Sequence, residues 1–137
     1  MNAALNLLQP EGFFKEGDGH DTHYQAVSIV ACVDLIQADY DDSSGSLRRG
    51  LKDSATWLAA RILPNGTIDS TGNSRTCGGG ESFLGELKRV SPIVVFQALA
   101  YAEVGSNDPI FAGPAQRVSN WMAVHSNDEP CFPLPTE

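Results

Sequence analysis

The chain has 137 residues, which is enough for one domain with a sizeable core. Its 17 Asp and Glu against nine Lys and Arg give a formal charge of −8. This balance disfavours nucleic acids and anionic membranes as partners, because proteins that bind them cluster Lys and Arg. Only 19% of the residues are charged and 42% are apolar, so we expect apolar surface to remain for a partner.

No segment approaches the ~18 uncharged apolar residues of a membrane span. The first residues have neither a basic region nor an apolar run long enough for a signal peptide. We therefore expect a cytoplasmic protein. Residues 3–8 resemble the end of a helix that Pro10 closes.

A glycine-rich polar loop at 12–21 leads into the first long predicted helix, 22–38. Asp21 or Thr22 is a plausible N-cap, since both residue types accept hydrogen bonds from a first helical turn. The helix is apolar on nearly every side, and a helix without a polar face must be surrounded by protein.

The second predicted helix, 46–63, has one apolar stripe and one polar face, and Pro64 ends it. The loop 65–85 lacks periodicity, and loops of that length tend to be functional or mobile. The third helix, 87–104, is again apolar all round, with Pro92 acceptable only in its first turn. A fourth helix follows at 114–125, so that residues 1–126 form a helical domain and 127–137 an extended, proline-rich tail.

This alternation of buried and amphipathic helices makes definite predictions about burial. The two apolar helices should be nearly inaccessible to solvent, while basic residues on the amphipathic helices should be exposed. The residues expected to be buried are Val27, Val30, Ala31, Val94, Ala98 and Tyr101, and those expected to be exposed are Arg48, Lys52 and Arg117.

The joints between helices also repeat. Pro10-x-Gly12 matches Pro64-x-Gly66, each after an amphipathic helix and before a glycine loop and a buried helix. Trp57 and Trp121 occupy similar places near the ends of the amphipathic helices. Two imperfect copies indicate a repeat, although a plain four-helix bundle or chance would also explain them.

This pattern resembles the α/α toroid, the architecture of polysaccharide lyases, several glycoside hydrolases and prenyltransferase relatives. The segment Gly19-His20-Asp21-Thr22-His23-Tyr24 resembles the starts of inner helices in lyase-type toroids. The resemblance implies an all-α fold of antiparallel helical hairpins, an incomplete toroid-like array of two inner and two outer helices. The chain holds too few hairpins for a complete ring, so it would be an open array, a ring completed by association, or a relative without catalysis.

The resemblance also implies a site at the start of the first buried helix. His20, His23 and Tyr24 would supply the acid and base of a β-elimination on a uronate polymer. Arg75, assisted by Asn73, would neutralise the substrate carboxylate. The residues proposed for ligand binding are Asp18, Asp21, Asn73 and Glu81.

Simpler interpretations of these residues remain open. His20 and His23 are three residues apart among carboxylates, which is only a weak metal signal, and both can serve to cap the helix. We therefore predict neither a metal nor a cofactor. The odd number of cysteines, Cys32, Cys77 and Cys131, argues against a disulfide framework. Cys77 is either a nucleophile or, as we prefer, a small residue in a flexible loop.

Two functions follow from the sequence. The first is a non-catalytic binding or assembly module whose ligand the sequence does not identify, a small molecule or a sugar being the candidates. The second is the carbohydrate-active enzyme. Both glycine loops precede buried helices that run in the same direction, so we expect 17–22 and 73–81 at the same end. Two outer helices and the loops cannot cover both buried helices. We therefore expect a homodimer whose interface draws on the buried helices or on 131–135. The alternative is that the tail folds over its own chain, covers the open side and leaves a monomer.

Overall fold

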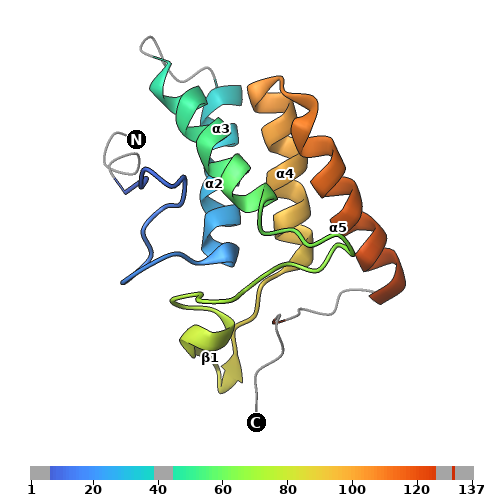
Figure 1. Ribbon diagram of the computed structural model, residues 1–137. Helices are drawn as coiled ribbons and strands as arrows, with labels where there is room; N and C mark the ends of the chain where they lie inside the picture. Colours follow the sequence, from blue (N-terminus) through green and yellow to red (C-terminus); the bar gives the residue numbers. More distant parts are fainter. Residues whose placement is uncertain (1–6, 39–44, 126–130, 132–137) are drawn as a thin grey trace.

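Four helices make up most of the computed structural model, which describes residues 7–38, 45–125 and 131 (Figure 1). The predicted all-α class is confirmed; a short antiparallel hairpin of two strands accompanies the helices. The expected helix at 3–8 and the tail 127–137 lie outside the described residues, apart from Leu7, Leu8 and Cys131. The helices are α2 (Thr22–Gln37), α3 (Ser46–Ala59), α4 (Pro92–Ser106) and α5 (Ala112–His125), the strands are β1 (Ser82–Phe83) and β2 (Glu86–Leu87), and two 3-10 turns are η1 (Cys77–Gly79) and η2 (Pro109–Phe111).

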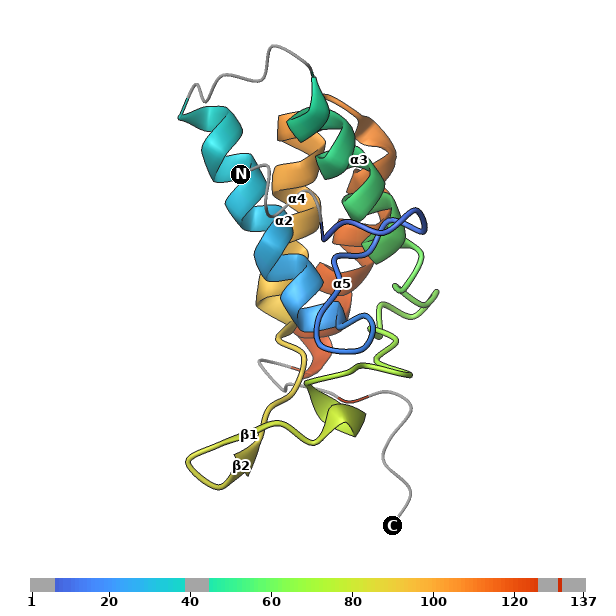
Figure 2. The ribbon, with the colours of Figure 1, turned by 90° about the vertical axis from the view of Figure 1, so that its left-hand side faces the viewer.

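The helices form two layers. α2 and α4 pack side by side, and α3 and α5 cover one face of this pair (Figures 1 and 2). The predicted stripe of α3 faces this core, since the side chains of Leu47, Leu51 and Leu58 are at most 1% exposed. Ile29 of α2 and Leu99 of α4 are fully buried against it. Burial of such side chains contributes about 1.5–3 kcal/mol each.

Within residues 7–38, 45–125 and 131, no helix covers the opposite face of α2 and α4. Val27 and Tyr101 are 44% and 42% exposed, Ala31 is exposed, and Val30 and Val94 are half-buried. The prediction that these residues are inaccessible was therefore wrong. Of that set only Ala98, at 0% exposure, is buried. The physical reason is that two outer helices cover only one side of two inner helices.

The basic residues were predicted more accurately. Arg48 and Lys52 of α3 are exposed, as expected. Arg117 of α5 is half-buried and donates to the backbone carbonyl of Ile62 at 3.4 Å, so its predicted exposure was wrong.

The repeated joint is a repeat in three dimensions. Gln9 N–H donates to Phe13 O at 2.8 Å, and 54 residues later Leu63 N–H donates to Thr67 O at the same distance. Gly12 and Gly66 have φ of +103° and +88°, which favour glycine. A Cβ on either glycine would collide with a helix, α3 in the case of Gly12 and α5 in the case of Gly66. It would lie 2.7 Å from Asp53 O for Gly12 and 2.2 Å from Arg117 O for Gly66, each beside a tryptophan, Trp57 or Trp121.

The start of α4 differs from the prediction. The helix begins at Pro92, its first residue, with Ser91 as N-cap, rather than at 87. The intervening residues turn through Leu84 and Gly85, whose φ angles are +52° and +82°, and form the hairpin of β1 and β2. Within the described residues the helices close no ring, and none is long and apolar enough to cross a membrane.

Candidate functional site

The two glycine loops meet at one end of the helices, as predicted. Ser74 N–H donates to His20 O at 2.9 Å, and the Ser74 hydroxyl donates to Glu16 O at 2.6 Å. The loop before α4 therefore lies directly against the loop before α2.

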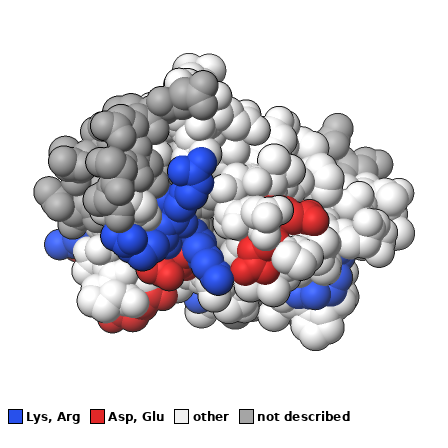
Figure 3. All heavy atoms as spheres, turned by 90° about the horizontal axis from the view of Figure 1, so that it is seen from above, with Lys and Arg blue, Asp and Glu red and all other residues white. Residues whose placement is uncertain are grey.

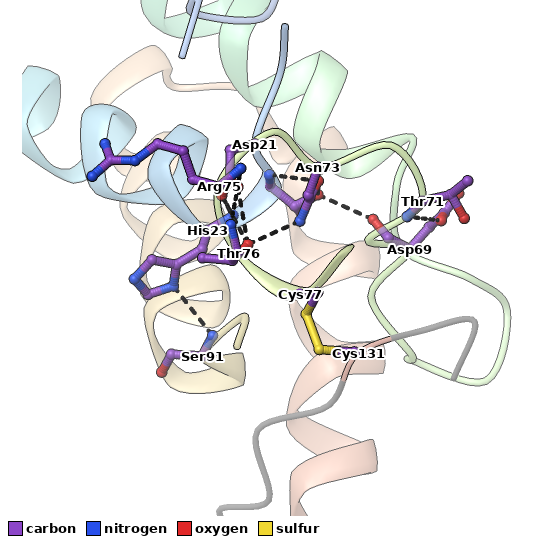
Figure 4. Close-up of a disulfide and its surroundings, with 11 residues drawn as sticks. Asp21, His23, Asp69, Thr71, Asn73, Arg75, Thr76, Cys77, Ser91 and Cys131 are labelled. Atoms are coloured by element: carbon purple, nitrogen blue, oxygen red, sulfur yellow. Dashed lines mark hydrogen bonds between the residues drawn. A yellow bond between two sulfur atoms is a disulfide. The ribbon is translucent and has the colours of Figure 1, made fainter. Parts of the chain in front are cut away.

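Asp21 joins these loops to the start of α2. Its carboxylate caps the helix by accepting from His23 N–H and Tyr24 N–H, at 3.1 and 3.2 Å. The same carboxylate accepts from the backbone N–H groups of Arg75 and Thr76, at 3.0 and 2.7 Å (Figure 4). Asp21 is 1% exposed. The Asp21 carboxylate, which was predicted to bind a ligand, is thus engaged in hydrogen bonds within the protein itself.

Asn73 is similarly occupied. It is 4% exposed; its side-chain oxygen accepts from Thr22 N–H at 3.1 Å and from the Thr22 hydroxyl at 2.8 Å. Its amide nitrogen donates to the Thr76 hydroxyl at 3.1 Å. Asn73 therefore fixes the loop to the first turn of α2.

A cluster of charged side chains surrounds Tyr24, and we call it the Tyr24 cluster: Glu16, Tyr24, Arg75, Glu81 and Lys88. The Tyr24 hydroxyl donates to Glu81 Oε2 at 2.7 Å and accepts from Lys88 Nζ at 3.0 Å. The Arg75 guanidinium lies 3.7 Å from the Tyr24 ring centroid. It pairs with Glu81 at 2.8 Å and with Glu16 at 3.0 Å.

These contacts shift the protonation of the Tyr24 cluster. The Tyr24 hydroxyl, followed by Arg75, lowers the pKa of Glu81 to about 2. Hydrogen bonds to Glu81 and Glu16 raise the pKa of Arg75, and the hydrogen bond to Tyr24 raises that of Lys88. All three shifts favour the charged forms of Glu81, Arg75 and Lys88.

An open cleft of about 290 Å³ lies beside the Tyr24 cluster, between the first turn of α2 and the hairpin. Its walls carry hydrogen-bond donors, an exposed aromatic ring and one carboxylate. The lining residues are His23, Tyr24, Phe83, Glu86, Leu87, Lys88 and Arg89.

The two histidines lie in different surroundings. His23 lines the cleft, and its Nδ1 accepts from Ser91 N–H at 3.2 Å, which places the proton of the neutral ring on Nε2. His20 instead contacts the rings of Phe13 and Trp57, with centroids 5.7 and 5.2 Å away. Of the four predicted catalytic residues, three are therefore brought together, and His20 stands in a separate cluster.

Cys77 is joined to Cys131 in a disulfide that links the loop to the C-terminal segment (Figure 4). The odd number of cysteines argued against a disulfide framework, yet two of the three are paired, and Cys77 is neither a nucleophile nor merely a small residue in a flexible loop. Cys32 is the free cysteine among the described residues, and burial raises its pKa to about 11.

Several residues of this region were not predicted. Lys88 had been assigned to a helix, Phe83, Glu86 and Arg89 carried no motif, and Glu16 was not singled out. The signal that could have revealed them is a cation and an aromatic residue within a few positions of Glu81.

Among the residues predicted to bind a ligand, Asp18 is exposed. Among residues 7–38, 45–125 and 131, no three His, Cys, Asp or Glu side chains gather as metal ligands would.

The chain matches no known protein family, no curated protein and no solved structure.

Proposed function

We propose that this chain is a non-catalytic assembly module that associates with a second copy through the open face of α2 and α4. The observation that carries the proposal is the exposure of large apolar side chains on these two helices. Ile93 is 47% exposed and Val104 69%, in addition to Val27 and Tyr101. Exposed apolar side chains gathered on two neighbouring helices commonly mark an interaction site.

The small number of charges on this layer supports the same conclusion. Asp34 is the single charged residue within α2, and Glu103 the single one within α4. α3, by contrast, carries Arg48, Arg49, Lys52 and Asp53. Few charges are therefore available to solvate the open face. The end at which α2 and α4 finish, unlike this face, carries a group of Lys and Arg side chains beside acidic ones (Figure 3).

The arrangement suits a two-fold dimer. Helices of 16 and 15 residues are about 24 and 22 Å long at ~1.5 Å per residue. Side by side they offer a face about 20 Å wide, since a helix is ~10 Å across. Such a face measures about 460 Å², a little more than half of the ~800 Å² per partner of a standard interface, so it would form the centre of a dimer contact rather than all of it. We also propose that the two helical hairpins, α2 with α3 and α4 with α5, are of the α/α-toroid type. The repeated joints before α2 and α4 support this proposal.

Substitutions on this face test the proposal. We expect Ala31→Glu and Val104→Glu to convert a dimer to a monomer in light scattering, while each variant stays folded because both residues are exposed. Val124→Glu is the matched control, because Val124 is 78% exposed on α5, away from the face. Equal association of all variants would contradict the proposal.

The alternative function is a lyase-type enzyme acting on a uronate polymer, for which the cleft beside His23 and Tyr24 is the supporting observation. The hydrogen bonds argue against it as the first choice. Arg75 already pairs with two glutamates, and the Tyr24 hydroxyl is engaged by Glu81 and Lys88. Incubation with uronate polymers distinguishes the two functions. A rise in absorbance at about 235 nm, from unsaturated product, would favour the enzyme.

A further inference from the structure

We propose that the cleft between α2 and the hairpin binds a small organic carboxylate with a flat or apolar body. This site is independent of the open face of α2 and α4. The cleft is lined by apolar side chains and by hydrogen-bond donors. Its position is fixed by the bonds of the Tyr24 cluster and Asp21 described above.

One guanidinium at the cleft is available to an anion. Three of the chain's nine Lys and Arg residues, Arg75, Lys88 and Arg89, gather here in a protein of formal charge −8. Glu16 and Glu81 neutralise Arg75, and Glu81 also lies 3.4 Å from Lys88 Nζ. These two glutamates thus balance Arg75 and Lys88. The charges left at the cleft are the guanidinium of Arg89 and the carboxylate of Glu86, and an anion would bind at Arg89.

Arg89 is suited to this role. It is exposed, it lines the cleft, and it makes no ion pair with any described residue. A guanidinium binds a carboxylate through two parallel hydrogen bonds, which gives both strength and orientation. Lys88 adds an ammonium group with three donors, of which Tyr24 and Glu81 engage two.

The apolar wall defines the rest of the ligand. Phe83 is 64% exposed on the hairpin, and its ring centroid lies 6.0 Å from Lys88 Nζ. Leu87 lines the cleft next to Lys88. An exposed aromatic ring beside cations offers a surface on which a planar or sugar ring can stack while its carboxylate meets Arg89.

The size of the cleft limits the ligand to a small molecule. A volume of about 290 Å³ is at the lower end of ligand sites. Glu86, the one acidic lining residue, would repel a second negative charge placed near it. We therefore infer a monocarboxylate, either an aromatic acid or a sugar acid.

Titration of the full chain by NMR tests this inference, with benzoate and glucuronate as probes and benzamide and glucose as their neutral counterparts. We expect at least one acid to shift the backbone amides of residues 86–89 with a Kd on the order of 1 mM. The neutral counterparts should cause no saturable shift, and higher salt should weaken binding. Stronger binding by benzoate would identify an aromatic acid, and stronger binding by glucuronate a sugar acid.

Two variants complete the test. Arg89→Gln should weaken binding by about tenfold or more, because a charge-assisted pair is lost. Arg48→Gln, an exposed arginine at the start of α3 and the opposite end of the bundle, should bind as the unmodified chain does (Figure 1). The inference is overturned if neither acid binds, if benzamide or glucose binds equally well, or if Arg89→Gln leaves the Kd unchanged.

Discussion

Thr76 donates twice to Asp21, through its backbone N–H at 2.7 Å and its hydroxyl at 3.0 Å. Thr76 is 0% exposed and follows Asp21 by 55 residues in the sequence. The carboxylate that caps the N-terminus of α2 thus also binds the loop that precedes α4. One side chain therefore connects the start of a helix to the wall of the cleft.

We predict that Asp21→Ala lowers the free energy of unfolding by about 3 kcal/mol. This loss of stability has two sources: the N-cap of α2 is removed, and buried donors lose their charge-assisted hydrogen bonds. Asp18→Ala is the matched control in the same loop; Asp18 is exposed, so its effect should stay within about 0.5 kcal/mol. Urea denaturation measures both values. Equal stability of the two variants would show that Asp21 does not hold the loops together.

A second prediction concerns the repeated joint. Gly66→Ala should destabilise the protein by several kcal/mol, because its Cβ would meet Arg117 O at 2.2 Å in addition to the strain of a positive φ. Gly17→Ala controls for the strain alone: its φ is +60°, but nothing lies within 4 Å of an added Cβ. Its cost should be about 1 kcal/mol. Thermal melts that place the two variants together would contradict the close packing of the joint on α5.

The ionisation of Glu81 predicts a pH dependence of stability. Its pKa falls from the ordinary glutamate value of 4.5 to about 2 in the folded protein. A lowered pKa stabilises the fold above the unfolded value, and this contribution is lost as the pH falls from about 4.5 towards 2. Glu81→Gln should therefore lose less stability than the unmodified chain over that range. Parallel curves of melting temperature against pH for the two proteins would contradict this prediction.

The disulfide predicts a dependence on redox conditions. Cys77 and Cys131 are 54 residues apart, and closing a loop of that length stabilises a fold by up to about 4 kcal/mol. A reductant should therefore lower the urea midpoint of the unmodified chain. It should not lower that of Cys77→Ser/Cys131→Ser, which keeps Cys32. An unchanged midpoint on reduction would mean that the disulfide contributes little to stability.

The helices could be predicted because each signal is local. Asp21 is an N-cap residue in front of an apolar run, and Leu47, Leu51 and Leu58 recur at helical spacing. The exposed sides of α2 and α4 could not be predicted in the same way. A helix that is apolar all round has no preferred side, so which of its residues are covered depends on how many neighbours the rest of the chain supplies.

The site was predicted only in part for similar reasons. His23, Tyr24 and Arg75 were placed together because both glycine loops were expected at one end. Lys88 was missed because strands of two residues are too short to show alternation, so the hairpin was absorbed into the following helix. Leu84, with its positive φ, gave no turn signal, since glycine and asparagine are the usual residues there. Cys131 is too distant in sequence to suggest Cys77 as its partner.

Sedimentation equilibrium of the unmodified chain at micromolar concentrations tests the proposed association most directly. The chain mass is 14.7 kDa. We predict a species of twice that mass, which dissociates on dilution, since two nearly uncharged helices expose Val27, Ile93, Tyr101 and Val104. A single species of 14.7 kDa at every concentration would contradict the assignment of this face as an interface.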